Sequence, residues 1–299
     1  MDDISRHLVY GVLLPLCVAS AAVLLPRGAW LRARTRLASV IGMAAVAVPM
    51  PIAFALINGS PSEKWERLIA MTLVGAIAAS VVLCGKDRQW RAWAAGMLAA
   101  ATATAIVWPI FQPADTVAER LLPGACIMFL IAGLEPLARR DNGAVVPISL
   151  WIAAMGTGIG VLWMGQLPFA AAVAPIGASM LALGVASGFG RPVATRGIVA
   201  AGAPALLMAS ALAYLWMSAL GANYPIGLTL VPAVAALAAW VVRVPWVKRR
   251  QRWMQCGLGW LAVALICAGA VLGMTLLDQQ GSNQDFDYDL PDFMRMPGD

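Results

Sequence analysis

A carboxylate inside an apolar run is the residue in this sequence best suited to carry protons or charge within a membrane. Glu135 lies in GLEPLARR, and Arg139 follows it four residues later. Residues at i and i+4 share one face of a helix, so the two side chains can pair. We favour an interfacial ion pair whose side chains snorkel toward water. A buried proton site, a usual role of embedded carboxylates in pumps and transporters, is the alternative.

The sequence offers few other groups for catalysis or metal binding. His7 is the single histidine, and the five cysteines form no CxxC pair or Cys/His cluster. A zinc site and a haem held by two histidines therefore lack ligands. The GxSxG, Walker A and HExxH patterns do not occur. We expect no catalytic residue, no metal site and no cofactor, hence a protein that is not an enzyme; a bound lipid is compatible with this expectation.

The composition predicts the secondary structure in which these residues lie. The chain is 61% hydrophobic and 12% charged, where soluble proteins have about 45–50% and about 25%. Runs of about 20 apolar residues, long enough to cross a bilayer, recur along the chain. Lipid offers the backbone no hydrogen-bond partner, so every N–H and C=O group of a span must bond within the protein. The spans should therefore be helices. We predict an all-α polytopic integral membrane protein, with a transmembrane domain over 1–277 and an acidic tail over 278–299.

About ten transmembrane helices in five hairpins are expected. Charged residues and turn residues bound the apolar runs at 8–25, 37–57, 68–84, 92–111, 121–138, 144–165, 168–188, 197–220, 224–242 and 253–277. The sixth and seventh runs are separated by three residues only, which predicts a tight hairpin. A re-entrant pair at this hairpin is the main alternative to the count of ten.

The basic residues fall on one side of this predicted topology. Sixteen of the 21 Lys and Arg lie in loops after odd-numbered helices, whereas most of the 15 acids lie on the other side. Short loops rich in Lys and Arg stay in the cytoplasm. The bias predicts a multi-pass protein of a bacterial inner membrane with both termini on the periplasmic side. The net charge of +6 is then a topology signal, and no nucleic-acid partner is expected.

Prolines and glycines indicate how the helices could repeat and pack. Pro15, Pro123, Pro175 and Pro232 lie at similar depths in four of the predicted helices, and their spacing suggests a hairpin repeat of about 54 residues. Small residues four apart let helix backbones approach closely. We favour helix packing over a substrate site for three such pairs, Gly156 with Gly160, Gly184 with Gly188, and Gly269 with Gly273.

Hydroxyl side chains inside the apolar runs have two interpretations. They could bind a neutral solute, or they could mediate contacts between helices. The set is Thr72, Ser80, Thr102, Thr104, Ser149, Thr157, Ser179, Ser210 and Thr229.

The C-terminal tail has the most distinct chemistry in the chain. Residues 278–284 read as a flexible polar linker, and the acids that follow alternate with apolar residues. The tail could be a solvated segment that helps keep this end outside. It could instead be a docking peptide whose apolar residues fill pockets on a partner. The docking residues would then be Phe286, Tyr288, Leu290, Pro291, Phe293 and Arg295.

Two classes of function remain from the sequence. The first, which we favour, is a noncatalytic membrane subunit or scaffold of a larger assembly, because few ionisable residues lie within the spans. Its partners would be membrane lipids and a membrane or periplasmic protein bound through the tail. The second is a permease or facilitator for a small neutral or amphipathic solute, without an obvious proton coupling.

Overall fold

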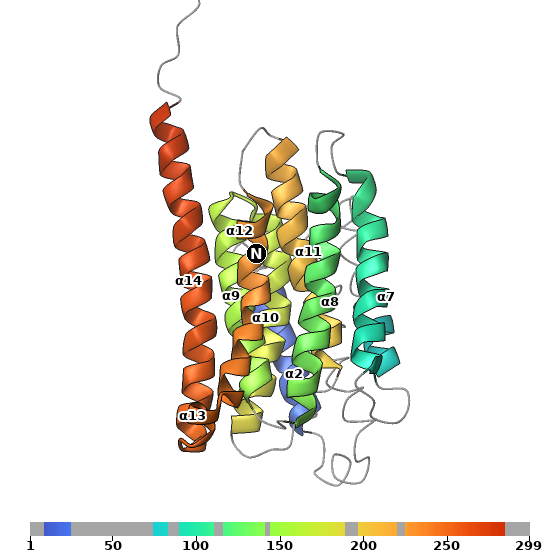
Figure 1. The fold of residues 1–299 in the computed structure, drawn as a ribbon, viewed down its shortest axis with the longest axis vertical. Helices are drawn as coiled ribbons and strands as arrows, with labels where there is room; N and C mark the ends of the chain where they lie inside the picture. The colour runs from blue at the N-terminus through green and yellow to red at the C-terminus, as the bar shows by residue number, and fades with distance from the viewer. Residues whose placement is uncertain are drawn as a thin grey trace, which may run out of the picture.

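A computed structural model describes residues 9–24, 74–82, 90–110, 116–140, 144–188, 197–219 and 225–284. These residues are almost entirely helical and include no strand, and Figure 1 shows their helices as a bundle with nearly parallel axes. The span predicted at 37–57 and the tail residues 285–299 lie outside this part of the chain. The all-α class is therefore observed for the described residues, while the count of ten spans and the hairpin repeat stay predictions.

The helices follow the predicted apolar runs closely. Residues 74–82 form a helical segment. The remaining elements are η1 (Val9–Leu13), α2 (Leu14–Leu24), α7 (Trp90–Val107), η2 (Trp108–Ile110), α8 (Val117–Arg140), α9 (Val145–Trp163), α10 (Leu167–Gly188), α11 (Ile198–Ala219), α12 (Ile226–Val234), η3 (Ala235–Arg243), α13 (Pro245–Lys248) and α14 (Arg252–Gln284).

Five helices in the described residues are long and apolar enough to cross a membrane. They cover Val117–Ala138, Val145–Trp163, Ile198–Leu215, Ile226–Arg243 and Arg252–Leu277. A shorter apolar helix covers Ala172–Gly188 within α10. This set is compatible with a multi-pass membrane protein.

The turn between α9 and α10 is as short as the sequence predicts. Gly165 has a φ of 71°, a left-handed conformation that costs glycine no steric penalty. The N–H of Gly165 donates to the carbonyl of Leu162, and the N–H of Gln166 donates to that of Val161. These two bonds form a Schellman motif, which satisfies the last carbonyls of α9. The two helices then pack antiparallel, with Gly177 facing Ala154.

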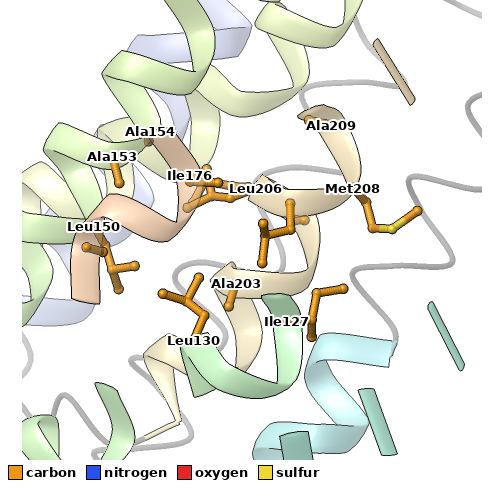
Figure 2. Packing of buried hydrophobic residues seen from close by; sticks show 14 of the residues in the cluster. Ile127, Leu130, Leu150, Ala153, Ala154, Ile176, Ala203, Leu206, Met208 and Ala209 are labelled. Carbon is orange, nitrogen blue, oxygen red and sulfur yellow. The ribbon is translucent and has the colours of Figure 1, made fainter. Parts of the chain in front are cut away.

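Helix α11 occupies the middle of the described bundle. It packs against α7, α8, α9, α10 and α12, and every residue of Ile198–Leu215 is buried. Figure 2 shows Leu206 of α11 among apolar side chains of its neighbours, with Leu130, Leu150 and Ile176 close by. A helix that is apolar on all sides is one that lies inside a larger structure.

The ninth predicted span differs from a single α-helix. It begins as α12 and continues as the 3₁₀ helix η3, which runs for nine residues. Such long 3₁₀ stretches are uncommon because their hydrogen-bond geometry is poorer. Pro232 lies inside α12 and lacks the N–H that would bond the carbonyl four residues before it. The stretch beyond this proline packs against α8, α9 and α14.

Two glycines lie where η3 contacts α8 and α14. A Cβ on Gly133 of α8 would lie 2.6 Å from Cδ2 of Leu237, and a Cβ on Gly259 of α14 would lie 2.8 Å from Cγ1 of Val242. The indole Nε1 of Trp240 also donates a hydrogen bond to the carbonyl of Gly133 at 2.8 Å. Side chains of η3 are thus seated against both neighbouring helices.

Helix α14 lies at the edge of the bundle and is its longest element. It packs against α9, α12, α13 and η3, and only 22% of its apolar window is buried. In Figure 1 its far end stands clear of the other helices. The helix continues to Gln284, so residues 278–284, which we expected to be a flexible linker, are helical. Each residue added to an existing helix gains a backbone hydrogen bond, which favours this extension.

Basic residues gather at one end of the described helices. Contacts of Gly96 with Met128 and of Gly124 with Ala100 make α7 and α8 antiparallel. The start of α7, which carries Arg91, and the end of α8, at Arg140, therefore lie together. Gly156 and Gly160 of α9 lie against Cys267 and Met274 of α14, so these two helices are parallel. Because α9 follows α8 directly and α13 leads from η3 into α14, η3 ends, and α13 and α14 begin, at this end. The orientation of the bundle in a membrane stays a prediction.

Candidate functional site

Glu135 lies inside the bundle, where α8 meets the beginning of α11. Its side chain has no exposed surface, and its Oε2 accepts a hydrogen bond from the backbone N–H of Gly197 at 3.3 Å. The two residues are 62 positions apart in the chain. The contact therefore joins two helices that the sequence does not place side by side.

Gly197 is the residue directly before α11, which begins at Ile198. Its carbonyl accepts the first intrahelical bond, from the N–H of Ala201, which makes it the N-cap. In a capping box, a glutamate three residues later in the same helix accepts the N–H of the N-cap residue. Glu135 performs this role from a different helix. A carboxylate at the first turn is also favoured by the helix dipole.

Gly197 itself has a φ of 79°. Residues other than glycine rarely adopt this backbone conformation. Glycine therefore lets the chain turn into α11 here at low steric cost. The signal was present in the sequence, because Gly197 stands directly before a long apolar run and glycine is accepted at N-caps. Its partner could not be named, since the sequence does not say which helix lies beside α11.

The predicted pairing of Glu135 with Arg139 stays a prediction. The side chain of Arg139 lies outside the described residues. The structure differs from the snorkelling arrangement in one respect, which is that the Glu135 carboxylate is fully buried rather than directed to water. The physical reason is the position of α11, whose N-terminus covers this face of α8.

Buried hydroxyls form the second polar feature of the interior. Ser210 and Thr229 donate to carbonyls of their own helices, at Leu206 and Ile226. The hydroxyls of three other buried residues, Ser149, Thr157 and Ser179, have no hydrogen-bond partner in the described part of the chain. A buried hydroxyl without a partner carries a desolvation cost.

The glycine pairs occupy different surroundings. A Cβ on Gly156 would lie 2.8 Å from both Cβ and Sγ of Cys267 on α14, and a Cβ on Gly160 would lie 3.4 Å from the end of Met274. Gly184 lies against Ile148 of α9, and Gly273 lies 3.3 Å from Leu228 of α12 by the same measure. Gly188 and Gly269 have no neighbour within 4 Å among the described residues. The structure thus brings one or both members of each pair to a helix contact.

Helix α14 presents an apolar surface that no described element covers. Leu261, Leu265, Leu272 and Leu276 are each more than half exposed, and their spacings of four and seven residues put them on one helix face. The six proposed docking residues of the tail, from Phe286 to Arg295, lie outside the described residues. The described helix leads directly to them.

No group of three or more His, Cys, Asp or Glu that could hold a metal ion occurs among the described residues. Comparisons with protein-family models, with curated proteins and with solved structures found no match for this chain. The class of protein is therefore defined by the fold itself, as an all-α protein with several membrane-compatible helices.

Proposed function

We propose that the chain is a noncatalytic membrane subunit that joins a larger assembly through α14 and the tail that follows it. The observation that carries this proposal is the contrast between α11 and α14. Helix α11 fills the middle of the bundle with apolar side chains, which suits a packing role. In helix α14 only 22% of the apolar window is buried, and its far end projects past the other helices in Figure 1.

The length of α14 supports a docking role for the tail. The apolar window ends at Leu277 and the helix ends at Gln284. At 1.5 Å per residue, these seven residues lift the tail by about 10 Å. The tail would then begin beyond the lipid headgroups, where a partner's soluble domain can reach it. Alternating apolar and acidic residues in such a segment suit a groove rimmed by basic side chains.

The localisation that follows is an inner membrane with the tail on the periplasmic side. It rests on the distribution of Lys and Arg between predicted loops. The gathering of basic residues at one end of the described helices supports it.

Affinity purification of the tagged full chain in mild detergent tests the proposal. We expect a partner protein in stoichiometric amount with the full chain, and loss of that partner when residues 285–299 are removed. A scrambled tail of the same composition is the matched control, because it keeps the charge and changes the order of the apolar residues. If the scrambled tail retains the partner, the tail acts by charge alone and the docking proposal fails.

A second candidate, a permease or facilitator for a small neutral or amphipathic solute, is favoured by the buried polar groups. Glu135 and the unpartnered hydroxyls of Ser149, Thr157 and Ser179 all lie inside the bundle. Purified protein in proteoliposomes separates the two candidates. Swelling in glycerol, urea or an amino acid, reduced when the three hydroxyl residues are changed to Ala or Val, would favour the permease, whereas vesicles that match protein-free controls would favour the subunit.

A further inference from the structure

The hairpin between η3 and α14 carries the densest positive charge in the described chain. Lys248, Arg249, Arg250 and Arg252 fall within five residues, and all four are exposed. Their side chains make no ion pair or hydrogen bond in the part of the chain that the structure describes. Each of these cations is therefore available to an external anion.

The elements of the hairpin itself supply no compensating acid. Helix α13 packs against η3 and α14, and no residue from Ala235 to Leu277 is an Asp or Glu. The first acid of α14 is Asp278, at the opposite end of the helix. Like charges this close repel one another, and a bound anion would relieve that repulsion.

The backbone of this hairpin is held in place rather than left as a loose loop. Nε2 of Gln255 donates to the carbonyls of Lys248 at 3.0 Å and of Arg250 at 2.7 Å. Val247 is fully buried beneath the hairpin. The four basic side chains therefore extend from an ordered backbone, so less conformational entropy is lost when they bind an anion.

Two exposed tryptophans flank the cations. Trp246 is 57% exposed and Trp253 is 70% exposed, and Nε1 of Trp253 is oriented by a 2.6 Å bond to Oε1 of Gln251. Exposed indoles are typical of the boundary between lipid tails and headgroups. The apolar window of α14 begins at Arg252, so the hairpin lies at this boundary.

We propose that residues 246–253 bind the headgroup of an anionic phospholipid. The phosphate would lie among the guanidinium and ammonium groups, which form charge-assisted bonds to its oxygens. The indoles would lie beside the glycerol backbone and the upper acyl chains. Basic clusters directly beside the cytoplasmic end of a transmembrane helix are suited to anionic lipid. This inference is independent of the proposed assembly, because it concerns the opposite end of the protein from the tail.

Native mass spectrometry of the purified full chain tests this site. The probes are dioleoyl phosphatidylglycerol and dioleoyl phosphatidylcholine, which share their acyl chains and differ in headgroup charge. We expect the phosphatidylglycerol to bind at least tenfold more tightly. The variant K248Q/R249Q/R250Q/R252Q should lose at least tenfold of that affinity, whereas R249K/R250K/R252K, which keeps the charge, should keep most of it.

A second charge-matched variant separates a site from net charge. R32Q/R34Q/K86Q/R88Q removes four cations from other predicted cytoplasmic loops, and it should bind phosphatidylglycerol as the wild type does. Equal losses in the two Gln variants would overturn the proposal, as would equal affinity for phosphatidylcholine. Competition by inorganic phosphate at millimolar concentration would also overturn it, since the site would then recognise a free anion.

Discussion

Oε2 of Glu135 lies 3.3 Å from the backbone N of Gly197 and accepts its hydrogen bond, so a carboxylate of α8 caps the N-terminus of α11. The capped helix is the one that is buried along Ile198–Leu215. The contact fixes where the central helix begins relative to its neighbour. Removing the carboxylate should therefore affect the whole bundle.

We expect Glu135→Ala to destabilise the protein by roughly 1–3 kcal/mol, because it leaves the N–H of Gly197 buried without this acceptor. Glu135→Gln should cost less, since its amide oxygen can still accept the bond. The measurement is the midpoint of thermal unfolding of the purified protein in mild detergent. Equal midpoints for Glu135→Ala and the wild type would show that the cap does not stabilise α11.

Trp240→Phe should weaken the contact between η3 and α8. The substitution keeps an aromatic ring but removes the donor to the Gly133 carbonyl. A typical buried hydrogen bond contributes about 0.5–1.5 kcal/mol. Trp253→Phe is the matched control, because that indole bonds only an exposed glutamine side chain at the surface. The same unfolding midpoint checks the prediction, which fails if the two variants lose equal stability.

Gly156→Ala should push α14 away from α9. The added methyl would lie 2.8 Å from Cβ of Cys267, and overpacking of this kind costs about 1–3 kcal/mol. Gly269→Ala is the matched control, since its methyl meets nothing within 4 Å and alanine favours a helix by about 1 kcal/mol over glycine. We expect a lower unfolding midpoint for the first variant and an equal or higher one for the second. The opposite order would contradict the packing of α9 on α14.

A photo-crosslinking residue on the exposed face of α14 should capture the proposed partner. Benzoylphenylalanine at Leu265 or at Leu272 would face outward, since both side chains are more than half exposed. Met97 on α7 is 61% exposed and supplies a control position on another helix. The measurement is to irradiate membranes and to identify the proteins that are crosslinked to the chain. Products from Met97 alone would place the partner on α7 instead of α14.

The helices were predictable because their causes are local. Long apolar runs fix where α8, α9 and α14 lie, and Gly165 permits the left-handed turn that a tight hairpin needs. The change from α12 to η3 was not predictable. Pro232 marks a weak point in the helix, but its sequence neighbours do not show that Gly133 and Gly259 of other helices lie against η3.

The environment of Glu135 depends on contacts far apart in the chain. The sequence gives its neighbour at i+4 and its apolar surroundings, which suit an interfacial pair as well as a buried group. The face of α8 that meets α11 is set by packing between residues that lie 62 positions apart in the chain. The exposure of α14 was likewise not predictable from the sequence, because its apolar run resembles that of α11, which is buried.

The mass of the particle extracted from native membranes by an amphipathic polymer, without detergent, shows whether a partner is bound through the tail. We predict a particle that contains the 31.4 kDa chain and a different protein in fixed ratio, and a particle without that protein for the truncated chain 1–284. A particle holding only this chain and lipid, with the same protein content for both forms, would rule out the proposed assembly.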